Sequence, residues 1–181
     1  MVYLILGLIL WTAAHLFKRV APELRAGMGA AGKGLVAVGV LAGLGLMIYG
    51  YRQAEFVNIW FPPAWAVHLN NLMMLGAVFL YGMSATKGRL RGALRHPQLT
   101  AVKVWAVAHL LVNGDLASLI LFGGLLAWAV LEVVVINLSE EWERPAPGEA
   151  KKDVLLVIIT VVMFLVITFI HNWLGVWPFP G

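Results

Sequence analysis

The sequence contains no cysteine and few charged residues. Only 12% of its 181 residues are Asp, Glu, Lys or Arg, about half of the roughly 25% that is usual in soluble domains. Without cysteine the chain cannot form disulfides, iron–sulfur clusters, a thiolate nucleophile, or a Cys-ligated zinc or haem site. It also lacks the GxGxxG, HExxH and GxSxG motifs, so nucleotide binding and classical hydrolysis have no support. Any metal or cofactor must be held by His, Met, carboxylate or main-chain groups.

Apolar residues fill most of the remaining sequence, at 61% of the chain. In water a fold of this length could not bury so much apolar surface, so the solvent of the chain is predicted to be lipid. A helix that crosses the hydrocarbon core needs roughly 20 mostly apolar residues. Six segments approach this length: Val2 to Phe17, Gly34 to Tyr51, Ala64 to Met83, Leu99 to Asn113, Leu116 to Leu138 and Val154 to Trp173. The sequence predicts an all-α, polytopic integral membrane bundle of six transmembrane helices, in a single transmembrane domain over residues 1–181.

The connections between these segments predict how some helices pack. Only Asn113, Gly114 and Asp115 separate the fourth and fifth segments, so these are predicted to form a tight helical hairpin with Gly114 at the reversal. In the second segment, Gly39 and Gly43 are four residues apart and permit close contact with another helix. The Gly/Ala-rich stretch from Ala26 to Lys33 is interpreted as a solvated linker.

The basic residues predict the orientation of the chain in a bacterial inner (cytoplasmic) membrane. Connections on one side hold eleven of the 13 basic residues: Lys18, Arg19, Arg25, Lys33, Lys87, Arg89, Arg91, Arg95, Arg144, Lys151 and Lys152. The opposite connections hold only Arg52. By the positive-inside rule both termini face outside. Because the basic residues occur in short clusters between apolar runs, we expect membrane lipid as a partner and no nucleic acid; the oligomeric state is not predicted.

Two charged residues fall within the predicted membrane helices, where an ionisable side chain costs several kcal/mol unless it pairs, reaches the interface or faces a cavity. Lys103 and Glu132 both lie about 9 Å from the cytoplasmic end of their helices. We predict that they form a structural ion pair across the hairpin, with a catalytic role as the alternative.

Histidines supply the candidate ligands. His109 shares one helical face with Trp105 and Asn113, so an imidazole there is flanked by an indole and an amide. His15 and His68 lie in neighbouring segments, and His68 is equally compatible with a buried, hydrogen-bonded histidine. His171, close to the outer boundary, is interpreted as an interfacial residue. In a cysteine-free helical bundle, haem ligation is the most natural chemistry for such imidazoles.

Several motifs resemble those of a known family. The central block of some thirty residues is the most specific part, and it contains Arg95-His96-Pro97-Gln98, Lys103-Val104-Trp105-Ala106-Val107-Ala108-His109, Asn113-Gly114-Asp115 and Phe122-Gly123. Further matches are His15 followed by Lys18 and Arg19, and Pro62-Pro63-Ala64-Trp65 followed by His68. The chain resembles the NnrU family of bacterial membrane proteins, which includes the 15-cis-zeta-carotene isomerases of phototrophs.

The resemblance implies a cofactor and its ligands. For the isomerase branch it implies haem b held by two histidines and active on a polyene only in the ferrous form. Residue by residue, these ligands fall on His109 and His15, with His68 as the alternative partner. The isomerases have a cysteine three residues before the second ligand, where this sequence has Ala106. The same redox-driven exchange of ligands is therefore less well supported here.

Three functions follow from these observations. The leading interpretation is a haem b-binding membrane protein of NnrU type, associated with denitrification and nitric oxide metabolism. The second is an enzyme, a haem-dependent cis–trans isomerase of a carotenoid such as 15-cis-zeta-carotene. The third is a membrane protein without haem that has a structural or transport role. The expected small partners are nitric oxide or a hydrophobic polyene, and no catalytic residue is predicted.

Overall fold

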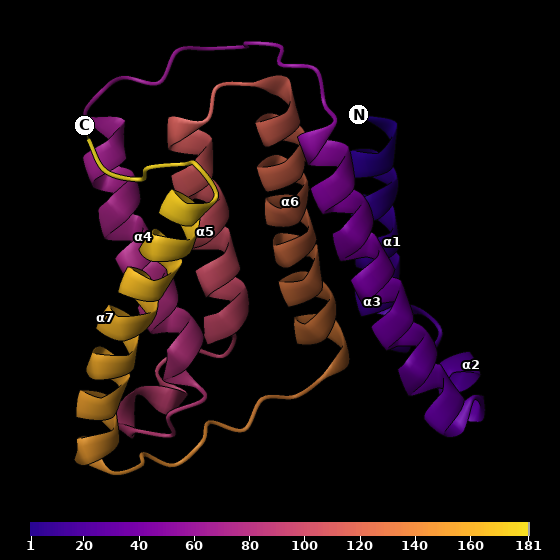
Figure 1. The fold of residues 1–181 in the computed structure, drawn as a ribbon. Helices are drawn as coiled ribbons and strands as arrows, with labels where there is room; N and C mark the ends of the chain where they lie inside the picture. The colour runs from indigo at the N-terminus through magenta and orange to yellow at the C-terminus, as the bar shows by residue number, and fades with distance from the viewer. Residues whose placement is uncertain (181) are drawn as a thin grey trace. The chain divides into compact units, whose positions relative to one another are not determined.

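The computed structural model describes residues 1–180, and within this range every named element is helical (Figure 1). The seven α-helices are α1 (Val2–Val20), α2 (Pro22–Gly27), α3 (Gly29–Arg52), α4 (Ala66–Met83), α5 (Pro97–Val112), α6 (Leu116–Ser139) and α7 (Ala150–Trp173). One 3₁₀-helix, η1 (Arg89–Gly92), precedes α5. The all-α prediction is confirmed.

Five helices are long and apolar enough to cross a membrane, namely α1, α3, α4, α6 and α7. The sixth predicted segment corresponds to α5, which is apolar but only 16 residues long. The helices begin and end within a few residues of the predicted segments. Five of the six predicted segments are therefore helices that are long and apolar enough to cross a membrane, as expected of a membrane helical bundle.

The interpretation of residues Ala26 to Lys33 as a linker is wrong. The chain is helical up to Gly27 and again from Gly29 onward. Only Met28 separates the two helices, and the first residue of α3, Gly29, has a φ of 53°, which suits glycine because it has no Cβ. Alanine is a strong helix former, and the alanines around this break extend both helices.

The described chain divides into two compact units, and the predicted hairpin and single domain both span them. The first unit contains Met1–Phe61 and Gly114–Glu140, and therefore α1, α2, α3 and α6. The second contains Pro62–Asn113 and the chain from Glu141 onward, and therefore α4, α5 and α7. Because α5 belongs to the second unit and α6 to the first, the tight hairpin between them stays a prediction, as does the single domain.

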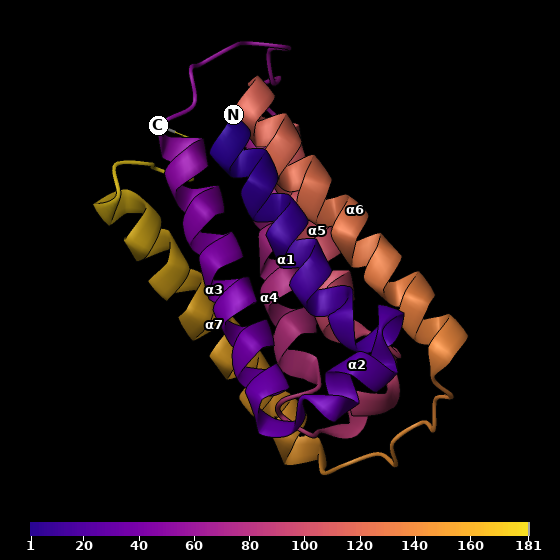
Figure 2. The ribbon, with the colours of Figure 1, turned by 90° about the vertical axis from the view of Figure 1, so that its right-hand side faces the viewer.

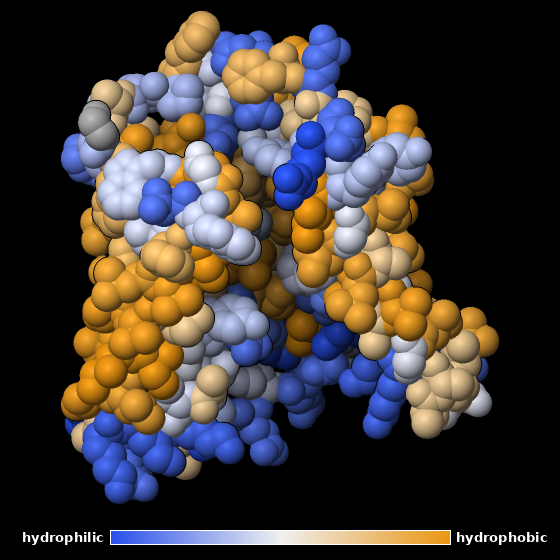
Figure 3. Space-filling model, viewed as in Figure 1, coloured by the Kyte–Doolittle hydropathy of each residue, from blue (hydrophilic) through white to orange (hydrophobic). Residues whose placement is uncertain are grey.

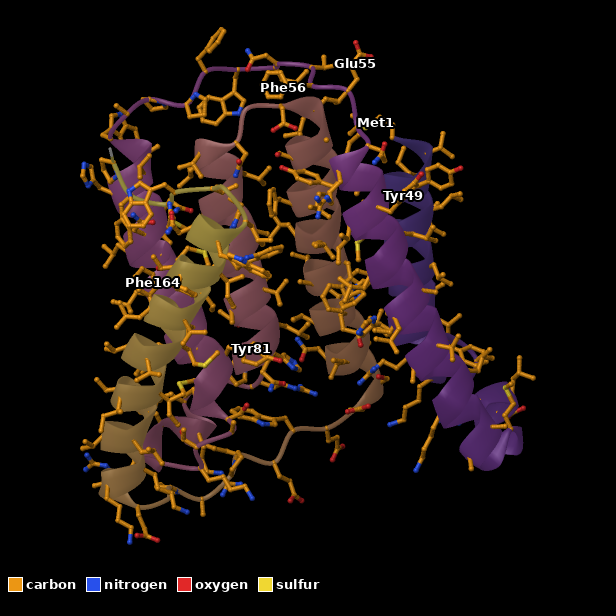
Figure 4. The ribbon with its side chains drawn as sticks, in the orientation of Figure 1. Met1, Tyr49, Glu55, Phe56, Tyr81 and Phe164 are labelled. Atoms are coloured by element: carbon orange, nitrogen blue, oxygen red, sulfur yellow. The ribbon has the colours of Figure 1, made fainter. Side chains whose placement is uncertain are left out.

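In the first unit, α1 and α3 lie side by side and antiparallel along their length (Figure 2). Glycines allow this approach: a Cβ on Gly7 would lie 2.6 Å from the main-chain nitrogen of Met47, and a Cβ on Gly43 would lie 2.9 Å from that of Trp11. Met1 and Tyr49 accordingly lie at the same end of the pair (Figure 4). The predicted close contact at Gly39 and Gly43 is confirmed, since Gly39 also faces the Ala14 side chain.

Enlarging Gly43 should therefore destabilise the first unit. We expect Gly43→Leu to lower the free energy of unfolding by about 1–3 kcal/mol, because the new side chain would meet the backbone of α1. Gly45→Leu is the matched control, since a Cβ there meets nothing within 4 Å. Denaturant unfolding of the two variants in the same detergent checks this expectation, and equal stability would contradict it.

The start of α6 is fixed to the end of α3 by polar contacts. The Asp115 carboxylate accepts hydrogen bonds from the Ser118 main-chain nitrogen at 2.9 Å and from the Ser118 hydroxyl at 2.6 Å, which caps the helix. The Tyr51 hydroxyl lies 2.8 Å from Ser118 Oγ. The connection that follows α3 contains the exposed residues Glu55 and Phe56 (Figure 4). Farther along it, the main-chain nitrogen of Ile59 donates to the Gly114 oxygen at 2.7 Å.

In the second unit, α4 packs against both α5 and α7. The chain after α7 returns to the start of α4, where the Asn71 amide donates to Pro178 O at 3.0 Å, and the ring of Phe179 lies 6.3 Å from that of Phe164. The face of α7 visible in Figure 3 is largely apolar and gives way to hydrophilic residues where the helix begins. There Asp153 pairs with Arg89 at 3.1 Å.

Candidate functional site

His15 lies on α1, in the first unit, with its imidazole held in one tautomer. Its Nδ1 is 2.8 Å from the main-chain oxygen of Trp11, one turn earlier. A carbonyl oxygen can only accept a hydrogen bond, so Nδ1 carries the proton. Nε2 therefore presents a lone pair, which is the form of neutral imidazole that binds a metal ion.

Aromatic rings surround His15. Its ring centroid lies 4.4 Å from that of Trp11 and 4.7 Å from that of Trp128 on α6. The two indole rings meet edge to face at 5.4 Å. Both indole nitrogens are buried and have no hydrogen-bond partner among residues 1–180. Buried donors are normally satisfied, so these two N–H groups are exceptions among the buried polar atoms of the first unit.

His109 lies on α5, in the second unit, with the same local geometry. Its Nδ1 donates to the main-chain oxygen of Trp105 at 3.0 Å, and the two ring centroids are 4.9 Å apart. Asn113 follows the last residue of α5, and its amide donates to the main-chain oxygen of His109 at 2.8 Å. Trp105 and His109 therefore share a face of the helix, whereas the amide of Asn113 caps its end.

The pattern Trp-x-x-x-His therefore occurs once in each unit. In both copies the tryptophan carbonyl orients the imidazole and the indole ring packs against it. The repetition is visible in the sequence as Trp11-Thr12-Ala13-Ala14-His15 and Trp105-Ala106-Val107-Ala108-His109. Sequence reasoning identified both histidines but missed their shared motif.

The other histidines have no tryptophan four residues earlier, although His171 makes the same kind of main-chain hydrogen bond. His171 on α7 donates from Nδ1 to Ile167 O at 2.8 Å and lies within electrostatic range of His109, a relation that sequence reasoning missed. His68 lies exposed in the first turn of α4. His15 and His109 belong to different units. Ligation of one haem iron by both residues therefore stays a prediction, as does the choice of His15 over His68 as the second ligand.

Glu132 on α6 is paired with Arg19, a residue that sequence reasoning placed in a connection. Arg19 Nη1 lies 2.8 Å from Glu132 Oε1, and Nη2 lies 3.3 Å from Glu140 Oε1. Glu132 is only 5% exposed. Arg19 can reach it because α1 continues to Val20. Lys103 lies in the second unit, so its predicted pair with Glu132 stays a prediction.

The arrangement of donors suits a cofactor better than a bare metal ion. Among residues 1–180, no three His, Asp or Glu side chains are placed to hold a metal. Zinc normally takes three or four protein ligands, whereas haem iron needs only one or two axial ligands from the protein. Each unit offers one oriented imidazole with an indole ring beside it, His15 with Trp11 and His109 with Trp105. These residues can supply the one or two ligands that haem iron needs.

Comparison with known families agrees with the sequence motifs. The family model described as NnrU protein matches residues 3–178. The chain belongs to the NnrU family. No curated protein and no solved structure is similar enough to this NnrU chain to count as a match. The matched residues of the chain include both Trp-x-x-x-His motifs, as well as Arg19 and Glu132.

Proposed function

We propose that this NnrU protein binds haem b in a bacterial inner membrane, that His15 and His109 would hold the haem iron, and that the protein acts in the nitric oxide metabolism of denitrification. The observation that carries the proposal is that each of the two imidazoles is held in one tautomer by the carbonyl of a tryptophan and also packs against the indole ring of that tryptophan. Each Nδ1 donates to the carbonyl of a tryptophan one turn earlier, which leaves Nε2 as the ligand atom. In a metal-bound histidine, the ring nitrogen that does not bind the metal usually donates a hydrogen bond. This bond orients the ring and raises the basicity of the nitrogen that binds the metal.

The residues around the two histidines have distinct roles in this proposal. Haem iron supplies redox chemistry and an affinity for diatomic gases such as nitric oxide. Trp11 and Trp128 pack against the imidazole of His15 and hold its position. On α5, Trp105 packs against His109 and Asn113 secures the end of the helix. If both imidazoles held the iron, a gas or substrate could reach it only after one of them was displaced, and His15 is the ligand that we expect to be displaceable.

A second candidate function is the cis–trans isomerisation of a carotenoid. The motif block from Arg95 to Gly123 supports it through its resemblance to the zeta-carotene isomerases. The buried Ala106 weighs against the same ligand exchange, because its methyl group cannot bind iron as a thiolate would. Nitric oxide handling requires only that one ligand be displaceable, so it remains the leading candidate.

Haem content tests the proposed function. Protein purified from haem-replete cells should give a pyridine haemochrome spectrum of b type with about one haem per chain. A colourless protein would contradict the proposal and favour the structural or transport interpretation. Titration of the ferrous protein with nitric oxide, beside an assay with 15-cis-zeta-carotene, then distinguishes gas binding from isomerase activity.

We further propose six transmembrane helices, with α5 as the sixth and both termini outside. The 16 residues of α5 rise about 24 Å, somewhat less than the roughly 30 Å hydrocarbon core. Basic residues cluster at the ends of the helices that this topology places in the cytoplasm.

Cysteine labelling tests this topology, and the absence of native cysteine makes the background low. A single cysteine at Glu55, in the loop after α3, should react with an impermeant maleimide in intact cells. A single cysteine at Ala93, beside η1, should react only after the membrane is opened. Labelling of the Ala93 variant in intact cells would contradict the orientation.

A further inference from the structure

Basic residues gather at one end of the second unit, where α4 ends and α7 begins. Lys87 lies in the connection after α4, Arg91 lies in η1, and Lys152 lies in the first turn of α7. Figure 3 shows hydrophilic residues around the start of α7. Since α4 and α7 are both long and apolar enough to cross a membrane, these basic residues lie where such helices would leave the hydrocarbon core.

Contacts between η1 and the start of α7 hold these segments together. The main-chain nitrogen of Gly148 donates to the main-chain oxygen of Gly88 at 3.1 Å. The Asp153 carboxylate accepts hydrogen bonds from Arg89 Nε at 3.1 Å and from the main-chain nitrogen of Leu90 at 3.4 Å. A Cβ on Gly88 would collide with Asp153, so glycine is needed for this close approach. The basic residues of the two segments therefore belong to one surface.

This surface keeps positive charge that the protein itself does not neutralise. Residues 84–96 and 141–153 hold seven basic but only four acidic side chains. Two of the acidic residues are paired, Asp153 with Arg89 at 3.1 Å and Glu149 with Lys151 at 2.6 Å. Three basic residues have no ion-pair partner among residues 1–180: Lys87, Arg91 and Lys152. A partner that carries negative charge would complement them.

Exposed apolar side chains border this positive charge. Val154 and Leu155 follow directly after Asp153 on α7, and Ile158 lies one turn farther along; all three are exposed. A partner that covers both regions must carry an anionic group beside hydrocarbon chains. An anionic phospholipid has this chemistry, whereas a soluble anion would leave the apolar side chains uncovered.

We propose that this surface binds an anionic phospholipid such as phosphatidylglycerol. Lys87, Arg91 and Lys152 donate hydrogen bonds to the phosphate oxygens of its headgroup, and its acyl chains lie against the exposed apolar face of α7. A zwitterionic phospholipid carries the same phosphate, but its cationic amine adds a charge of the same sign as the surface. The surface therefore prefers the anionic lipid.

Native mass spectrometry of the full-length protein in detergent tests this preference, with phosphatidylglycerol and phosphatidylcholine of identical acyl chains. We expect phosphatidylglycerol to be retained at an about 5- to 25-fold lower lipid concentration, because each Lys or Arg near an anionic lipid surface contributes about five-fold. Equal retention of the two lipids would overturn the proposal. Inorganic phosphate at the same concentration should not displace the lipid; displacement would assign the surface to a soluble anion and overturn the proposal as well.

Two double variants separate this surface from the general positive charge of the protein. Lys87→Gln with Lys152→Gln should lower the preference for phosphatidylglycerol to less than about 3-fold. Lys18→Gln with Lys33→Gln removes the same charge from exposed lysines of the first unit and should leave the preference unchanged. Equal losses in the two double variants would overturn the assignment to this surface.

A third comparison changes the arrangement of the surface without changing its charge. Gly88→Ala places a Cβ against Asp153, and we expect the displaced η1 to weaken the preference for phosphatidylglycerol. Gly34→Ala on α3 is the matched control, since a Cβ there meets nothing within 4 Å. An unchanged preference in both the Gly88→Ala variant and the Lys87→Gln, Lys152→Gln variant would overturn the proposal.

Discussion

Replacing His109 with alanine is expected to abolish haem retention, reducing haem from about one per chain to a trace in the purified protein. The imidazole of His109 is oriented by the Trp105 carbonyl, and no other side chain on α5 offers an equivalent ligand on that face. A methyl group at this position cannot bind iron. The Soret absorbance relative to protein absorbance measures the loss, and a normal Soret band in His109→Ala would contradict the assignment.

Variants of the other histidines serve as controls for this result. His15→Ala should retain haem but shift its spectrum toward five-coordinate iron, because one axial ligand remains. His68→Ala should leave the spectrum largely unchanged, since His68 is exposed at the start of α4. If His68→Ala instead gives the five-coordinate spectrum, then His68 and not His15 is the second ligand.

Removing Glu132 is expected to destabilise the protein by about 3 kcal/mol, because Glu132→Ala leaves the largely buried Arg19 guanidinium without its closest partner. The Arg19 side chain is 18% exposed and keeps its contact with Glu140, which places the cost at the lower end of the range for buried pairs. Denaturant unfolding in detergent measures the change.

Glu140→Ala is the matched control, since it removes the other carboxylate that contacts Arg19. The Glu140 side chain is 46% exposed, so its loss should cost less than about 1 kcal/mol. Exchanging the charges in Arg19→Glu with Glu132→Arg should recover part of the stability lost in Glu132→Ala. Equal effects of Glu132→Ala and Glu140→Ala would show that burial does not govern this pair.

The helical segments could be predicted because their signal is local. A membrane helix requires a continuous apolar run of known length, and the sequence displays each run directly. The approach of α1 and α3 was likewise visible in the spacing of Gly39 and Gly43. The error at residues 26–33 arose because a Gly/Ala-rich stretch is compatible both with a linker and with a helix, and contacts beyond the sequence decide between them.

The polar partners were harder to predict because they depend on where a helix ends and which neighbour it meets. Arg19 was assigned to a connection, yet three more residues of helix bring it level with Glu132. The orientation of each imidazole depends on a main-chain hydrogen bond four residues earlier, which residue type alone does not reveal.

The electron paramagnetic resonance spectrum of the purified ferric protein tests the central claim most directly, because it reports both the presence of haem and its axial ligands. Two imidazoles on one iron predict a low-spin ferric signal, and His15→Ala should convert it to a high-spin signal. A purified wild-type protein with a high-spin ferric signal, or with no haem signal, would contradict ligation by His15 and His109.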